Sequence, residues 1–113
     1  MIRIYHNPRC RKSRAGLEYL SSKTQDFEII DYLKNPLSLD ELTSLFKKLD
    51  LEPSEMIRKQ EQIFKDEFKG KDLSSEEWLK AMAKHPKLIH RPIVEKGDKA
   101  VFAQPPETID QIL

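Results

Sequence analysis

The sequence is poor in cysteine and glycine and has no long apolar run: one Cys and three Gly occur in 113 residues. A lone cysteine excludes an internal disulfide, a Cys-x-x-Cys redox pair and a metal site built from several thiols. No segment approaches the roughly 18 consecutive apolar residues of a transmembrane helix, and residues 1–5 lead directly into polar residues, without the apolar stretch of a secretion signal. We therefore expect a cytoplasmic protein that has a reduced thiol and no membrane association.

An excess of charge of one sign is also lacking, because 20 basic and 19 acidic side chains leave a formal net charge of +1. Nothing in this balance requires a nucleic-acid or anionic-membrane partner. Locally the balance differs, since no acid precedes Glu18 and four cations surround the only cysteine, Cys10: Arg9, Arg11, Lys12 and Arg14. A nucleic-acid or peptide patch is the plain alternative, but this cluster lacks interleaved aromatic residues.

The N-terminal third has the pattern of a strand–helix–strand unit. Residues 3–5 read as a short strand, and a helix should begin near Cys10 or Arg11 and continue to about Ser22. A second strand is expected at residues 27–30. Such a unit of about 30 residues predicts two parallel strands joined by a right-handed crossover.

The middle of the chain is expected to be helical. Ser38 with Glu41, and Ser74 with Glu77, have the spacing of capping boxes. An apolar stripe follows the first box, at Leu42, Leu45, Phe46 and Leu49, and a short helix should open at residue 53 and continue through residue 58. The second box should start a helix that ends near Lys84 with Trp78, Leu79 and Met82 buried.

The tail returns to strands at residues 92–95 and 99–102, which flank a hairpin turn around Gly97. A last helix is expected from residue 105, with an apolar face of Ile109, Ile112 and Leu113. The fold class is thus α/β, with a four-stranded mixed sheet flanked by helices. Residues 1–113 should form a single domain that has a helical insertion at about 38–84, between the second and third strands.

The thiol of Cys10 has surroundings that favour ionisation. An ordinary cysteine, with a pKa near 8.5, is only about 3% thiolate at pH 7. The free N–H groups of the helix start, the four neighbouring cations and His6, four residues back, would all increase that fraction. An inert thiol is the commoner fate of a lone cysteine, but inert thiols lie among apolar neighbours, and this one does not. We interpret Cys10 as a reactive thiol.

The sequence also restricts which thiol chemistry is open to Cys10. Ser13 occupies the second position of a Cys-x-x-Cys pair, and Gly16 occupies the position where a Cys-x5-Arg phosphatase loop needs arginine. What remains is a thiolate in an anion-attracting loop, with Ser13 as a nearby hydrogen-bond donor. It would attack a small oxyanion or form a mixed disulfide, and the second thiol must come from outside the chain.

The loop from His6 to Arg14 resembles the active-site loop of the ArsC family, the glutaredoxin-coupled arsenate reductases and their relatives. The similarity continues through the segments 31–36, 56–59 and 85–89, the Arg-Pro strand at 91–94 and the helix start at 105–107. It covers essentially the whole chain. The resemblance implies a thioredoxin-like fold with a helical insertion.

The resemblance also implies roles for the loop residues. Cys10 would attack the arsenic of arsenate as the catalytic thiolate. His6, Ser13 and Arg14 would activate the thiolate, and Ser13 and Arg14 would also organise the anion.

Three further positions would hold the oxyanion. Arg58 and Arg91 offer planar forks of donors to pairs of oxygen atoms. Gln104 stands where the reductases carry a third arginine, and it would make a weaker, uncharged contact. The bond before Pro92 is expected to be cis.

The resemblance implies glutathione as co-substrate and glutaredoxin as partner, with no bound metal or organic cofactor. Two other functions stay open. Regulators of the Spx type resemble the same fold and bind RNA polymerase, although those that sense oxidation commonly use a Cys-x-x-Cys pair. A thiol oxidoreductase acting on glutathione mixed disulfides is the other alternative.

Overall fold

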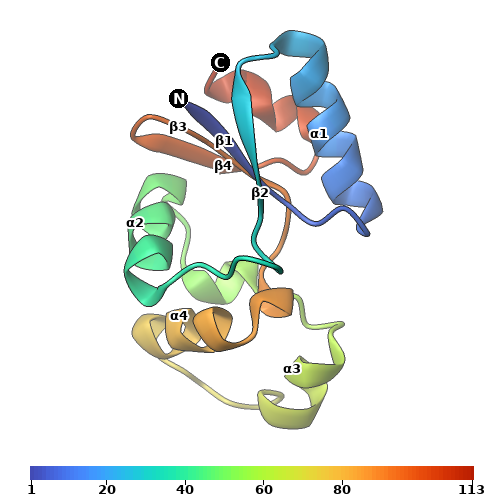
Figure 1. Ribbon diagram of the computed structural model, residues 1–113. Coiled ribbons are helices and arrows are strands. Elements are labelled where there is room, and N and C mark those ends of the chain that lie inside the picture. Colours follow the sequence, from blue (N-terminus) through green and yellow to red (C-terminus); the bar gives the residue numbers. More distant parts are fainter. The chain divides into compact units, whose positions relative to one another are not determined.

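The computed structural model describes residues 1–113 (Figure 1). The chain divides into two compact units, residues 1–35 together with 91–113, and residues 36–90. None of the helices combines the length and the apolar character that crossing a membrane requires.

The first unit is built on a four-stranded sheet in the order β2-β1-β3-β4. β1 pairs with β2 in parallel and with β3 antiparallel, and β3 pairs antiparallel with β4. The predicted parallel pair and C-terminal hairpin are therefore confirmed. The strands span Ile2–His6 (β1), Phe27–Asp31 (β2), Ile93–Lys96 (β3) and Lys99–Phe102 (β4).

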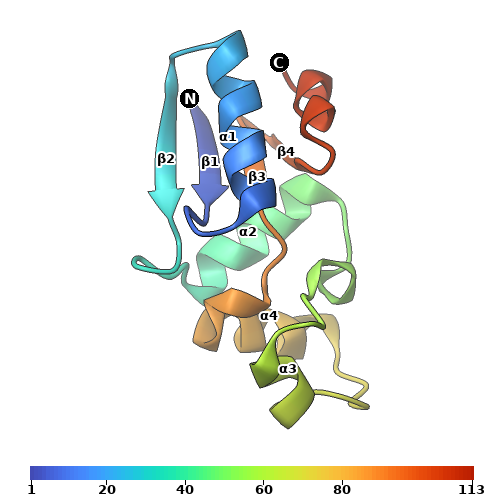
Figure 2. The ribbon, with the colours of Figure 1, turned by 90° about the vertical axis from the view of Figure 1, so that its right-hand side faces the viewer.

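One face of this sheet carries the apolar core of the first unit. Helix α1 (Arg11–Lys23) runs along the sheet (Figure 2) and contacts the short helix η3 (Pro106–Gln111). Because side chains alternate along a strand, Ile2 and Ile4 face this core while Arg3 is exposed. The other buried members of the cluster are Leu20, Val94, Ala103 and Ile109.

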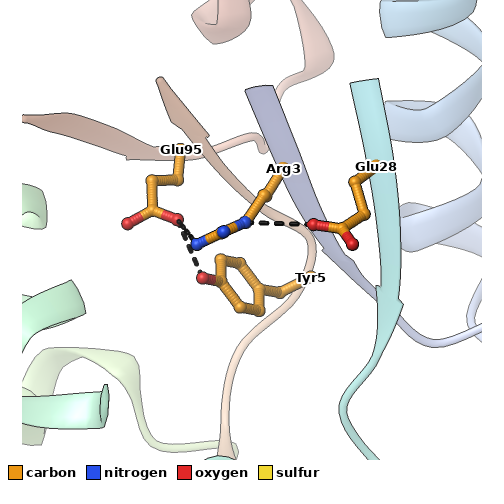
Figure 3. A network of polar contacts seen from close by, with 4 residues as sticks. All are labelled: Arg3, Tyr5, Glu28 and Glu95. Atoms are coloured by element: carbon orange, nitrogen blue, oxygen red, sulfur yellow. Dashed lines mark hydrogen bonds and ion pairs between the residues drawn. The ribbon is translucent and has the colours of Figure 1, made fainter. Parts of the chain in front are cut away.

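The alternate side chains of the sheet form a polar network (Figure 3). The buried Tyr5 hydroxyl donates to Glu95 Oε1 at 2.8 Å, and Arg3 lies 3.8 Å from the same oxygen. Arg3 Nε also donates to Glu28 Oε1 at 3.1 Å. Burial and the hydrogen bond to Glu95 raise the pKa of Tyr5, so its hydroxyl stays protonated and satisfies the buried carboxylate.

The second unit is helical and confirms both capping boxes. Ser38 Oγ accepts from the Glu41 N–H and Ser74 Oγ from the Glu77 N–H, while each Glu side chain accepts from its N-cap amide. The predicted buried residues of both helices are buried, and α2 packs against α4. The elements are α2 (Leu39–Leu49), η1 (Pro53–Met56), α3 (Gln62–Glu67), α4 (Ser75–Lys84) and η2 (Pro86–Leu88).

Three details differ from the sequence expectations. The helix opened by residue 53 ends at Met56, because Ile57 instead forms a β-bridge with Ile89. Leu113 was expected on an apolar face but is 43% exposed, since the last helix is a 3-10 helix that ends at Gln111. Helix α3 was not predicted; its phenylalanine Phe64 stacks on Trp78, and Phe68, next to the helix, also contacts that ring.

Candidate active site

A tight turn delivers Cys10 from strand β1 to helix α1. The Cys10 N–H donates to the Asn7 carbonyl at 3.0 Å, and the Arg9 N–H donates to Asn7 Oδ1 at 3.0 Å. Asn at the first position and Pro8 at the second are typical of such a turn. Cys10 follows with extended backbone angles as the N-cap of α1, so its side chain lies beside the free amides of the first helical turn.

The side chain of Ser13 fastens the first turn of α1 to the end of β1. Its Oγ accepts from the Asn7 N–H at 2.9 Å and shares a hydrogen bond of 2.7 Å with His6 Nδ1. Ser13 is completely buried and His6 nearly so. The hydroxyl therefore binds the strand end, and its expected part in activating the thiolate or organising the anion stays a prediction.

His6 lies nearly buried at the end of β1, where its ring is hydrogen-bonded to Ser13. Burial lowers the pKa of His6, Arg14 lowers it further, and the opposing effects of Asp31 and Ser13 do not compensate. This shift favours the neutral form of the ring near pH 7. Its part in thiolate activation stays a prediction, and in this structure its Nδ1 is hydrogen-bonded to Ser13 Oγ.

Arg14 makes a second contact between α1 and the loop that precedes it. Its guanidinium donates from Nη1 to the Pro8 carbonyl at 3.0 Å, and the side chain is exposed. This contact holds the turn that carries Cys10. The predicted effect of Arg14 on the thiolate or on a bound anion remains a prediction.

The thiol of Cys10 is partly buried and easier to ionise than an ordinary cysteine. Burial raises the pKa of Cys10, but the Ser13 N–H, the Arg91 side chain and the Lys12 N–H outweigh it, so the pKa lies below its usual value. No side-chain capping hydrogen bond is formed in the structure, so these groups act by stabilising the charged sulfur once the proton has left.

The donors that lower the Cys10 pKa most are two backbone amides and the Arg91 side chain. The effect expected of the four cations next to Cys10 in the sequence stays a prediction. Arg9, Arg11 and Lys12 are exposed, and their side chains form no ion pair. We refer to these three residues as the basic rim.

Arg91 reaches the thiol from the loop before β3. Its side chain is buried, with 6% of the residue exposed, and the Arg91–Pro92 bond is cis, the isomer that the resemblance implies. Helix α1 approaches Pro92 closely: a Cβ at Gly16 would lie 2.5 Å from Pro92 Cγ. Glycine at this position thus allows the helix that carries Cys10 to pack against the Arg91–Pro92 segment.

Arg58 and Gln104, the other two expected oxyanion ligands, have different surroundings. Arg58 belongs to the second unit, where its Nε donates to Glu61 Oε2 at 3.1 Å and its backbone N–H donates to the Leu88 carbonyl. Gln104 is exposed at the end of the hairpin, next to a second cis bond, Gln104–Pro105. Their parts in anion binding stay predictions.

The free N–H groups that the sequence places at the helix start are those of Lys12 and Ser13, two and three residues after the N-cap Cys10. Sequence reasoning missed one contributor to the site, Asn7. Asn7 shapes the turn through both of its oxygen-bearing groups, and the Asn-Pro pair was the available signal.

The order of the sheet, the single cysteine at the first helix start and the arginine before a cis proline together define a thioredoxin-like protein with one cysteine. Within that class, the chain belongs to the ArsC family, whose sequence model matches residues 5–112. It is 43% identical over 112 residues to the arsenate reductase of Haemophilus influenzae, a match that covers 97% of both chains. It is 39% identical to that of Neisseria meningitidis serogroup A, over 99% of this chain and 97% of the relative.

A solved structure supports the same assignment. The arsenate reductase from Vibrio cholerae superposes with a TM-score of 0.93 at 40% identity, covering 99% of this chain and 97% of that chain. The expected fold class, a thioredoxin-like four-stranded sheet with a helical insertion between the second and third strands, is confirmed.

Proposed function

We propose that this protein reduces arsenate to arsenite, with Cys10 as the nucleophile. The observation that carries the proposal is the position of Cys10 as the uncapped N-cap of α1, where two backbone amides and Arg91 lower the pKa of its thiol. The same three donors suit a tetrahedral oxyanion brought to the sulfur, because donors that stabilise a thiolate also stabilise anionic oxygen. The arsenate-reductase names of relatives with 39–43% identity support this substrate.

The thiolate would attack arsenic, form a sulfur–arsenic bond and displace one oxygen, which leaves as water after protonation. Arg91 would neutralise charge on the remaining oxygens, and we keep Arg58 as a second cationic ligand. The overall reaction uses two thiols per arsenate: arsenic gains two electrons, the thiols become a disulfide and one oxygen leaves as water.

The second thiol must come from another molecule because Cys10 is the only cysteine. We propose glutathione for this role and glutaredoxin for the return of the enzyme to its reduced state. A cytoplasmic setting, in which thiols stay reduced, suits this chemistry. We propose no metal or organic cofactor for the reaction.

The test is arsenate-dependent NADPH consumption in the presence of glutathione, glutathione reductase and glutaredoxin. Wild type is compared with Cys10→Ser and with Lys99→Gln, an exposed change on β4 that serves as the control. We expect turnover for wild type and the control, and a loss of at least about a thousandfold for Cys10→Ser. Omission of glutaredoxin should abolish sustained turnover.

Gln104→Arg provides a graded test of the anion site. If Gln104 faces the oxyanion, an added guanidinium should lower the arsenate KM, since a hydrogen bond to a charged group contributes about 1.5–3 kcal/mol. An unchanged KM would remove Gln104 from the site. Reduction of hydroxyethyl disulfide without any arsenate turnover would instead favour a thiol oxidoreductase that acts on mixed disulfides.

A further inference from the structure

The basic rim of Arg9, Arg11 and Lys12 has no structural partner. All three side chains are exposed, and none makes an ion pair or a hydrogen bond. By contrast Arg14, from the same cluster, is bonded to the Pro8 carbonyl. The rim therefore presents three uncompensated positive charges on both sides of Cys10 along the chain.

The positive charges of the rim lie at the N-terminus of α1, where they are unfavourable for the helix. Helix α1 has no acid in its first turn, whereas α2 and α4 have Asp40 with Glu41 and Glu76 with Glu77. Cations near a helix N-terminus oppose the helix dipole. The rim thus does not complement the dipole of α1, and the largest effects that lower the Cys10 pKa come from Arg91 and two backbone amides.

We propose that the basic rim is a docking surface for small thiols and disulfides that carry carboxylates. The inference rests on the proposed function and extends it, because that function needs a second thiol from solution and leaves open what recognises it. Charge complementarity selects the carboxylates, and Cys10, a partly exposed residue, lies within the same segment. The rim covers one turn and one helix start, which suits a small molecule better than a partner protein, whose interface needs about 800 Å² per side.

The reaction at this surface is thiol–disulfide exchange. The Cys10 thiolate attacks one sulfur of the bound disulfide, a new sulfur–sulfur bond to Cys10 forms, and the old one breaks. The other half of the reagent leaves as a thiolate. One disulfide is consumed and one is formed, so no further oxidant or reductant is needed.

The experiment measures the rate of this exchange with two reagents of different charge. 5,5′-Dithiobis(2-nitrobenzoate) carries two carboxylates, and 4,4′-dithiodipyridine is uncharged at pH 7. Both are mixed with wild type and with Arg9→Gln/Arg11→Gln at low and at high salt. The control is Lys96→Gln/Lys99→Gln, which removes the same charge from exposed residues at the ends of the β3–β4 hairpin strands.

We expect the ratio of anionic to uncharged rates to fall about tenfold in Arg9→Gln/Arg11→Gln at low salt. The control should stay within about twofold of wild type, and high salt should remove most of the difference. The Cys10 pKa, read from the pH profile of iodoacetamide modification, should match wild type in both variants. An unchanged ratio, or a loss explained by a raised pKa, would overturn the proposal.

The exchange assay contains no arsenate, so its outcome is independent of the proposed substrate. A protein that fails to reduce arsenate but keeps the rim-dependent preference would contradict the proposed function and leave the docking surface in place. A protein that reduces arsenate and shows no rim dependence would do the reverse.

Discussion

The start of helix α1 and the start of helix α4 differ in what binds the free backbone amides of the first helical turn. At α4, Ser74 and Glu77 satisfy each other's amides, and Glu76 and Glu77 complement the helix dipole. At α1 the N-cap is Cys10, which forms no capping hydrogen bond and is followed by cations. The α4 start is built for stability by residues close in sequence, as is the start of α2.

The difference shows what a reactive thiol requires of a helix. A capping serine would take up the amide of the third helical residue, as Ser74 takes up that of Glu77. At α1 the amides of Lys12 and Ser13 instead lower the Cys10 pKa, so the thiolate replaces the cap. Contacts from elsewhere hold the helix start in compensation: Ser13 to His6 and Asn7, Arg14 to Pro8, and Gly16 against Pro92.

The contact between Gly16 and Pro92 offers the largest test of this comparison. On helix propensity alone, Gly16→Ala should stabilise the protein by about 1 kcal/mol. Because the new methyl group would lie 2.5 Å from Pro92 Cγ, we expect the free energy of unfolding to fall instead, by about 1–3 kcal/mol. Urea denaturation measures this, and a stabilised variant would show that the contact does not hold α1.

A thiol placed at the start of α4 tests whether the N-cap position alone activates a thiol, without the other groups that surround Cys10. The double variant Cys10→Ser/Ser74→Cys carries one thiol, at a helix N-cap next to acids. We expect the Ser74→Cys change to cost about 1 kcal/mol, because the capping hydrogen bond is lost. Its thiol should react with iodoacetamide at pH 7 more slowly than Cys10 in wild type. Equal rates would mean that any helix N-cap suffices for activation.

The pH dependence of stability should distinguish the thiolate from an ordinary cap. The Cys10 pKa is lower in the folded than in the unfolded protein, so over the interval between these two values the unfolded state holds the extra proton. Stability in wild type should therefore rise with pH up to about 8.5 relative to Cys10→Ser, and the benefit should be lost as pH falls through the folded pKa. Urea midpoints of both proteins from pH 5 to 9 provide the measurement. Parallel curves would contradict the thiolate cap.

The charges of the two first turns should show the smallest effects, with opposite signs. Arg11→Glu places an acid where α1 has none, and we expect a gain of about 0.3–1 kcal/mol in the free energy of unfolding. Glu76→Arg at α4 should lower the free energy of unfolding by a similar amount, because it puts a cation in the first turn and removes the ion pair with Lys80. Thermal unfolding at low salt compares them, and high salt should shrink both effects. Two changes of the same sign would refute the dipole argument.

The features that follow from neighbouring residues could be predicted from the sequence. The capping boxes of Ser38 and Ser74, the strand–helix–strand unit and the hairpin around Gly97 each depend on residues a few positions apart. Helix α3 could not be predicted in this way, because its aromatic residue Phe64 packs against Trp78 in another helix. Local patterns say little where an element is stabilised by a distant side chain.

In the candidate site, too, some features depend on neighbouring residues and others on residues distant in the sequence. The sequence by itself determined that Cys10 begins a helix and lies among cations, because these are facts of adjacency. Only the tertiary structure decided which charge acts on the sulfur: it places Arg91, from the distant end of the chain, at the thiol and leaves Arg9 and Arg11 in solvent. It also directs His6 to Ser13. The physical reason is that electrostatic and hydrogen-bond effects depend on distance and burial in space, which folding sets and sequence proximity does not.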